Sequence, residues 1–575
     1  MRKTNKLLLS TVLALAIPAG AMAAEVDLQA KLDKLSQQME DLKGQVQRVE
    51  DKSLGKWLQI GGSYQFRVDS LHGKTAAYVS APATFANAQS IMQSGFFNAI
   101  DPTNGQSTFS PTYTGTWTPA QATQFWQANL GSMMTFAANM ANVKNVSQAQ
   151  AFLGANSAML GGLSGFGVQV PAGKPQNETL YTNKFALDLK AKATKDVTVN
   201  VKLGMYKVFG SQDDKAVNGN AYFADRTGVF DGVLGHVPSS SYLNVDRAYA
   251  TWSNIMDQPV WLSVGRRPST DGAPTNLKSN NERPGNGGTP ALLVNYAFDG
   301  MTLGYAPDID MLPGFYAKVC YGRGFDSGYH QAVSNSLKDT DMLGVAIIPV
   351  DTDPLRVWLQ WNRGFNIFDF PVMNNTAFGN TSPSVNLGSI DWYGIGAMST
   401  LKKVGPGDLN FFVDGGLSVT HPTTAVSANA MFQGLLTGGV FNPEAPSDKT
   451  GYAVFAGVRY DLPSKTKLGF EFNYGSKNWI TFSPAADDMW TSKVGTRGKV
   501  YEPYVIQELD LKPISSFFAK TFFKLGYQYY DFEYTGSNNW VGAPIKISDI
   551  TPTTMLLQAP VKEAHNIYGT FEVHF

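Results

Sequence analysis

The chain has 575 residues, with 46 basic and 46 acidic side chains, and its formal net charge at neutral pH is zero. Charged residues make up only 16% of the sequence, which argues against a nucleic-acid-binding protein, because such proteins concentrate positive charge. Cys320 is the single cysteine, which excludes disulfide frameworks, cysteine-ligated zinc, iron–sulfur clusters and haem-attachment motifs.

Residues 1–23 have the three regions of a secretory signal peptide. A basic start precedes a short apolar run from Leu7 to Ile17, and Ala21-Met22-Ala23 supplies the small residues that a signal peptidase reads. No later apolar run approaches the roughly 18 residues of a membrane-spanning helix. We therefore expect cleavage after Ala23 and export to the periplasm, the outer membrane or the medium.

Residues 24–54 are predicted to form a periplasmic coiled coil. Apolar residues recur there at alternating spacings of four and three, which is a heptad pattern with polar residues on every other face. We interpret the pattern as a short trimerising helix; the core face of a buried helix is the alternative. So short a coiled coil is marginal alone, so a second subunit contact is expected. The predicted oligomerisation positions are Leu28, Leu32, Leu35, Met39, Leu42, Val46 and Val49.

After Gly55 the apolar period changes to two. Apolar and polar residues alternate from Leu58 to Asp69, so a strand there has one apolar and one polar face. In a transmembrane barrel the apolar face meets lipid and the polar face lines a wet lumen. The same alternation returns near 197–204, 355–362, 452–461 and 467–474.

Residues 57–575 are therefore predicted to form an all-β, transmembrane antiparallel β-barrel of about 16 strands, with 14 or 18 as alternatives. Short turns alternate with long polar connections, such as 475–498, as in barrels with short periplasmic turns and long outer loops. A soluble β-sandwich would not explain the signal peptide, the heptads and the terminal Phe together. The strands are predicted at 57–69, 180–193, 197–210, 242–254, 259–268, 290–306, 314–324, 341–350, 355–363, 389–403, 408–420, 450–462, 466–476, 499–511, 516–531 and 563–575.

A barrel of this size encloses an aqueous channel unless loops block it. By strand parity, the charged side chains on the polar face line that channel, and basic ones outnumber acidic ones. This excess predicts a mild preference for anions. The pore-lining candidates are Arg67, Asp69, Lys202, Arg356, Arg459, Asp461 and Glu471.

Two connections could block or narrow the channel. Residues 71–178 form a long first loop that is poor in charge, which is untypical of a solvated disordered tail. This loop could plug the lumen, cap the mouth or contact a partner, with a self-packed surface loop as the alternative.

The second connection, 265–288, carries opposed charges, which filter solutes when they face each other in a constriction; an ordinary external loop is the alternative. The constriction candidates are Arg266, Arg267, Asp271, Lys278, Glu282 and Arg283.

The last ten residues alternate up to the final residue, with Phe571, Val573 and Phe575 on one apolar face. No backbone group can stay unpaired in hydrocarbon, so the last strand of a barrel must pair with the first. The ending resembles the C-terminal insertion signal of bacterial outer-membrane barrels, whose last residue is typically Phe. These three residues are the predicted assembly signal, read by the barrel assembly machinery.

Catalysis has no support in the sequence. The six histidines show no metal-ligand spacing, and the acidic pairs lack an EF-hand pattern. We predict no enzyme activity, no catalytic residue, no metal and no cofactor.

Three short motifs add a family resemblance: Asp246-Arg247-Ala248-Tyr249, Gly265-Arg266-Arg267-Pro268 and Thr496-Arg497-Gly498. With the signal peptide, the heptads and the terminal Phe, they resemble porin-like bacterial outer-membrane proteins with an N-terminal periplasmic coiled coil. The three motifs are similar to those of a poorly characterised group of such proteins from metal-reducing delta-proteobacteria. In general porins, the loop after the fifth strand folds inward, which is the position of residues 265–288.

The resemblance implies a barrel in the outer membrane of a Gram-negative bacterium, in contact with its lipid. We predict a trimeric porin for passive diffusion of small hydrophilic solutes or ions, with no nucleic-acid partner. The alternative is a structural or sheath barrel that holds a partner, such as a multihaem cytochrome or a cell-wall component.

Overall fold

The computed structural model describes most of the chain from residue 57 onwards. The chain divides into two compact units, Met1–Gln59 and Ile60–Phe575. The predicted signal peptide and coiled coil lie outside the described residues, except for Met39, which is helical and exposed. The described ranges are 57–88, 135–136, 138–210, 237–238, 240–268, 272–283, 290–329, 337–376, 379–483, 487–510 and 520–575, together with residues 39 and 124.

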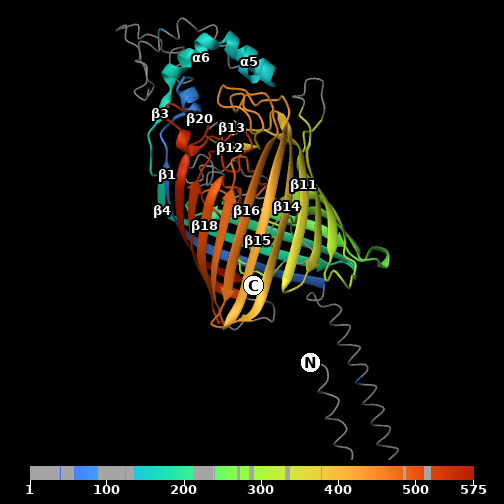
Figure 1. Cartoon of the computed structure of the whole chain (residues 1–575). Coiled ribbons are helices and arrows are strands. Elements are labelled where there is room, and N and C mark those ends of the chain that lie inside the picture. The colour runs from blue at the N-terminus through green and yellow to red at the C-terminus, as the bar shows by residue number, and fades with distance from the viewer. Residues whose placement is uncertain are drawn as a thin grey trace, which may run out of the picture. The chain divides into compact units, whose positions relative to one another are not determined.

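Sixteen strands close into one antiparallel barrel (Figure 1). Strands that follow each other along the chain are neighbours in the wall, and β1 lies between β21 and β4. The predicted fold class and the count of 16 are confirmed. The barrel strands are β1 Leu58–Thr75, β4 Gln176–Lys192, β5 Val197–Val208, β6 Ser240–Trp252, β7 Val260–Pro268, β8 Ala297–Tyr305, β9 Tyr316–Phe325, β10 Thr340–Asp351, β11 Leu355–Phe368, β14 Asn386–Val404, β15 Gly407–Pro422, β16 Lys449–Asp461, β17 Thr466–Gly475, β18 Gly498–Glu508, β19 Lys520–Phe532 and β21 Val561–His574.

The strand alternation gives the wall two chemically different faces. Apolar side chains such as Leu303, Val413 and Ile567 point outward, and each is 54% exposed. Their neighbours Asp414 and Tyr568 point inward and are fully buried. An apolar outer face is what a wall in contact with lipid requires. Within the described ranges, no helix has both the length and the hydropathy needed to cross a membrane.

The last strand closes the wall against the first, as the sequence predicts. Phe66 of β1 lies opposite Phe571 of β21, and the pairing extends from Ser63 to Thr75. At the end of the chain, the Phe575 amide donates to the Gly62 carbonyl (3.0 Å), and the Gly62 amide donates to the Phe575 carbonyl (2.8 Å). The pairing of the terminal strand with the strand at 58–68 is thereby confirmed.

Smaller elements gather beyond one end of the barrel (Figure 1). The side chain of Asn145 caps α5 (Val146–Ala155) by accepting from the Gln148 amide at 2.9 Å. Phe152 of that helix packs on Phe432, with 5.5 Å between ring centroids. The described part of the long first connection therefore packs on the connection after β15. These elements are β2 Tyr78–Ser80, β3 Val168–Val170, β12 Met373–Thr376, β13 Gly379–Thr381, β20 Met555–Leu556, α5 Val146–Ala155 and α6 Ser157–Leu163, with the 3-10 turns η1 Ser164–Phe166 and η6 Ile547–Asp549. Two further 3-10 turns lie elsewhere: η4 Ile255–Asp257 in the short connection between β6 and β7, and η5 Lys493–Gly495 in the connection between β17 and β18.

One predicted strand is shorter in the structure. The alternation from residue 290 predicts a strand over 290–306, but β8 begins only at Ala297. Leu292 and Leu293 are fully buried and pack with inner-face side chains such as Trp392. Residues 290–296 thus belong to a segment inside the barrel, which defines the site described next.

Candidate functional site: the barrel lumen

The connection between β7 and β8 folds into the barrel. We call its described residues, 272–283 and 290–296, the first inward segment. The Leu277 carbonyl accepts from Arg459 Nη1 of β16 at 2.5 Å. Lys278 Nζ lies 2.6 Å from Glu502 Oε1 of β18. The segment starts from β7, and β16 and β18 flank β17, which lies eight strands from β7 in either direction around the 16-strand wall. These contacts therefore place the segment across the lumen.

Beyond Lys278 the first inward segment continues towards the end of the barrel that carries the short turns. Asn280 Nδ2 donates to Glu508 Oε1 at 2.8 Å, at the last residue of β18. Arg283 donates to the Thr352 carbonyl at 2.6 Å and lies 3.1 Å from Asp351, both next to the turn between β10 and β11. The segment therefore traverses much of the lumen's depth as well as its width.

The connection between β17 and β18 also folds inward. We call residues 476–483 and 487–497 the second inward segment. Trp479, Ile480 and Trp490 are buried, and Trp392 of β14 donates to the Ile480 carbonyl at 2.9 Å. The sequence prediction treats 475–498 as a long external loop, and the structure corrects it. The apolar pairs Trp479-Ile480 and Met489-Trp490, which are unusual in a solvated loop, were the available signal.

The two inward segments bind each other through their backbones. The Phe482 amide donates to the Leu293 carbonyl at 2.9 Å, and the Asn295 amide donates to the Phe482 carbonyl at 3.0 Å. The Thr481 hydroxyl adds a bond to the Leu292 carbonyl at 2.5 Å. Together the segments form one body inside the barrel, packed on the inner face of β10–β16.

Four charges, of which three are buried and Lys278 is partly exposed, hold this body to the wall, and we call Lys278, Lys493, Glu471 and Glu502 the ion-pair centre. Lys493 Nζ bonds to Glu471 and lies 2.5 Å from Glu502 Oε2. Glu502 has no solvent exposure, and Tyr568 Oη donates to its Oε1 at 2.8 Å. Each inward segment thus contributes one lysine: Lys278 of the first binds Glu502, and Lys493 of the second binds both glutamates of the wall.

Lys493 of the ion-pair centre remains charged at neutral pH. Burial alone would lower the pKa of Lys493, but the adjacent Glu471 and Glu502 carboxylates raise it well above its usual range. A raised lysine pKa means that the pairing is fully present at neutral pH and is lost only in strongly alkaline solution. The centre is therefore a constitutive attachment rather than a switch in the physiological range.

Solvent reaches a different part of the inner face, on β4–β6. On β4, Tyr181 points outward and stacks on Phe66, so residues of even number point inward. Asp188 and Lys190 point inward and are nevertheless exposed. Basic side chains outnumber acidic ones here, and we call the set the basic wall. Its members are Lys184, Lys190, Lys192, Lys202 and Arg247.

All seven predicted pore-lining residues lie on the inner face, but most are covered. Arg67 and Asp69 bind each other at 2.7 Å without solvent exposure. Arg356, Arg459 and Glu471 are also buried, whereas Lys202 and Asp461 are partly exposed. Strand parity identifies the face correctly, but it cannot reveal which inner-face side chains the inward segments cover.

The six predicted constriction residues do not form one cluster. Lys278 and Arg283 lie inside the barrel, Glu282 is exposed, and Asp271 lies outside the described residues. Arg267 is buried on the inner face, 8% exposed. Arg266 is a correction: it shares the outer face with Val264 and binds Asp299 at 2.8 Å. Successive strand residues point to opposite faces, so Arg266 and Arg267 cannot both face the lumen.

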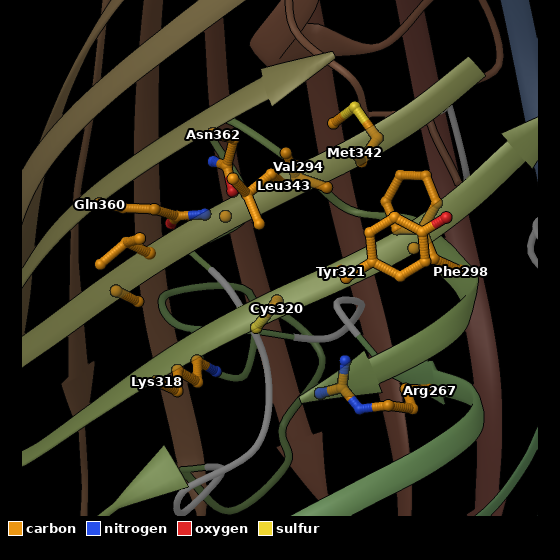
Figure 2. A pocket seen from close by; sticks show the side chains of 14 residues that line it. Arg267, Val294, Phe298, Lys318, Cys320, Tyr321, Met342, Leu343, Gln360 and Asn362 are labelled. Atoms are coloured by element: carbon orange, nitrogen blue, oxygen red, sulfur yellow. The ribbon is translucent and has the colours of Figure 1, made fainter. Parts of the chain in front are cut away.

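A small cavity lies between the first inward segment and the inner face of β9–β11 (Figure 2). Arg267, Lys318, Gln360 and Asn362 contribute its polar lining. Across the described ranges, no group of three or more His, Cys, Asp or Glu side chains is placed to hold a metal ion.

The closed wall with its apolar outer face defines a transmembrane β-barrel protein, whose lumen is divided by its own inward segments. The chain belongs to the family described as "Protein of unknown function (DUF3373)", whose model matches residues 174–575. That match runs from just before β4 to the C-terminus. No curated protein matches the chain.

Several solved outer-membrane proteins are similar to this chain at low identity. OmpT of Vibrio cholerae, in a trimer form, is 12% identical over 70% of this chain and 93% of its own, with a TM-score of 0.34. The outer membrane channel DcaP of Acinetobacter baumannii is 9% identical over 90% and 98%, with a TM-score of 0.34. OprB of Pseudomonas putida is 10% identical over 92% and 96%, with a TM-score of 0.38. These values are too low to assign a function.

Proposed function

We propose that the protein is an outer-membrane channel for passive diffusion of small hydrophilic solutes, with a preference for anions. The observation that carries the proposal is the basic wall: inner-face side chains of β4–β6 are in contact with solvent, and basic ones outnumber acidic ones among those that carry a charge. Charged rings along a water-filled path select ions of the opposite sign.

The distribution of charge pairs supports an anion preference more strongly than a total count of lumen charges does. Across the lumen, Glu471 and Glu502 are neutralised by Lys278 and Lys493 and are shielded from water. A buried, paired carboxylate has little effect on ions in the channel. Lys184 and Arg247 of the basic wall are themselves paired with Asp487 and Asp246, so its more exposed members, such as Lys190 and Lys192, contribute most to the potential in the remaining path.

A sheath that encloses a folded partner receives less support. The first inward segment reaches from β7 to β18, and the second adds two buried tryptophans beside it. A folded domain the size of a cytochrome would have to displace this packed body. A partner that binds the smaller elements beyond the end of the barrel, or the predicted coiled coil, is compatible with the channel.

The trimer, the periplasmic coiled coil at 24–54 and recognition by the barrel assembly machinery stay predictions. Light scattering of the detergent-solubilised protein, with and without residues 24–54, would test the first two. We expect trimers when the segment is present and a smaller fraction of trimers without it. Monomers in both samples would contradict the trimer, and equal trimer fractions would contradict a role of the coiled coil.

Purified protein in planar bilayers tests the channel itself. We expect stable open-channel steps, and a double variant Lys190→Gln, Lys202→Gln should lower the conductance about twofold at low salt, because fewer counterions are attracted. In concentrated salt, where the screening length falls to about 3 Å, the variant should conduct like the wild type. The matched control is Arg266→Gln, which removes one positive charge from the outer face and should change neither value. Electrically silent protein would contradict the proposal.

A further inference from the structure

The cavity on the inner face of β9–β11 has the composition of an anion-binding site. Its volume is about 490 Å³ when the open solvent at its mouth is included. Val294 of the first inward segment and Phe298 of β8 form its apolar side, and Lys318, Gln360 and Asn362 project from the wall. Figure 2 shows Cys320 between the two basic side chains, Arg267 and Lys318, and the two amides.

Three polar side chains in this cavity have atoms without a hydrogen-bond partner in the described part of the chain. They are Nε of Arg267, Nδ2 of Asn362 and Oε1 of Gln360, and each residue is more than nine-tenths buried. Buried polar atoms are normally paired, so such a group of unpaired atoms calls for a ligand. Two of the three atoms are donors, which fits an acceptor-rich ligand.

The charge of the cavity points to the same class of ligand. Arg267 and Lys318 both line it and are 8% and 4% exposed. Among the described residues that line the cavity, none is acidic. A lining with two buried cations and no acidic side chain favours an anion, and oxoanions make strong hydrogen bonds to such donors.

Two glycines shape the cavity. A Cβ atom at Gly344 would lie 2.5 Å from Oδ1 of Asn362, and one at Gly322 would lie 2.5 Å from Cβ of Phe298. Any larger residue at these positions would displace the amide or the ring. The missing side chains therefore allow Asn362 and Phe298 to lie over β10 and β9, where they border the ligand space.

We propose that this cavity binds a small inorganic oxoanion, such as hydrogen phosphate. Arg267 and Lys318 neutralise it, Asn362 donates to one oxygen, and Oε1 of Gln360 accepts from its hydroxyl. The inference rests on the proposed function, because the anion reaches the cavity through the water of the channel. The site would hold permeating oxoanions beside the first inward segment.

Cys320 provides a reporter inside the cavity. It is the only cysteine of the chain, and it is partly exposed. In the full-length protein, we expect a methanethiosulfonate reagent that carries a sulfonate to modify Cys320 about tenfold faster than one that carries a trimethylammonium group, because of the charges of Arg267 and Lys318. Inorganic phosphate should slow the reaction with the anionic reagent.

Variants at neighbouring positions provide the matched comparison. Arg267→Gln should remove the preference for the anionic reagent and the protection by phosphate. Arg266→Gln changes the adjacent side chain, which lies on the outer face, and should leave both intact. Protection of the wild-type protein by phosphate needs no variant, so it stays informative if Arg267→Gln fails to fold.

Equal rates for the two reagents, no protection by phosphate, or reaction only after unfolding would each overturn the site. This readout involves no current, so it is independent of the channel experiment. A conducting protein without protection at Cys320 overturns the oxoanion site alone. A silent protein with phosphate-protected Cys320 overturns the channel alone.

Discussion

Glu502→Gln is expected to destabilise the barrel by about 3–5 kcal/mol, the usual cost of removing one partner from a buried ion pair. The Glu502 side chain is fully buried and accepts from Lys278, Lys493 and Tyr568. Glutamine keeps the shape but leaves two lysines with less compensation. Those lysines belong to the two inward segments, so the variant should hold the segments less firmly. Its single-channel currents should therefore be larger and noisier than those of the wild type. Thermal unfolding in detergent and single-channel recording measure the two effects.

The matched control for this prediction lies on the same strand. Glu508 binds Lys467 and Asn280, but its side chain is 22% exposed. Glu508→Gln should therefore cost about 1 kcal/mol or less, as for other solvent-accessible ion pairs. If Glu502→Gln unfolds at the wild-type temperature and conducts with wild-type noise, the ion-pair centre does not hold the inward segments.

Replacing the last residue, Phe575→Ser, is expected to reduce the amount of protein in the outer membrane to a small fraction of the wild-type level. The backbone pairing of residue 575 with Gly62 does not depend on the side chain, so the purified variant should still refold in detergent. The defect would then lie in recognition during assembly. Quantitative immunoblotting of outer-membrane fractions, alongside refolding in vitro, separates the two steps.

Ile567→Ser is the control for the terminal variant. Ile567 lies on the same strand and points outward, and its exposure of 54% is close to the 52% of Phe575. This variant removes a lipid-facing apolar side chain at a position distant from the chain end. It should therefore accumulate in the outer membrane at nearly the wild-type level. Equal loss of both variants would show that the apolar surface of β21 matters and the terminal residue does not.

The wall of the barrel could be predicted from the sequence because each strand carries its own signal. The alternation from Leu58 to Asp69 defines two faces, and the structure places Arg67 and Asp69 on the inner one. The closing partner of the last strand follows from the requirement to pair every edge in hydrocarbon. Local pattern and global constraint agree along most of the wall; the exception is the start of β8.

The contents of the lumen could not be predicted in the same way. The bond between Lys278 and Glu502 joins residues that only the closed barrel brings together. The inward segments have no regular period, so their burial shows only as apolar pairs such as Leu292-Leu293 and Trp479-Ile480. The outward orientation of Arg266 could have been predicted from the sequence, because a strand that continues to Pro268 forces Arg266 and Arg267 onto opposite faces.

The reversal potential of the wild-type channel in a KCl gradient tests the central claim most directly. Potassium and chloride have nearly equal mobilities in water, so the sign of the potential reports the selectivity of the pore itself. Since the exposed inner-face charges of β4–β6 are mainly basic, we predict a potential displaced towards the chloride equilibrium value. A displacement towards the potassium value would contradict an anion path along the basic wall.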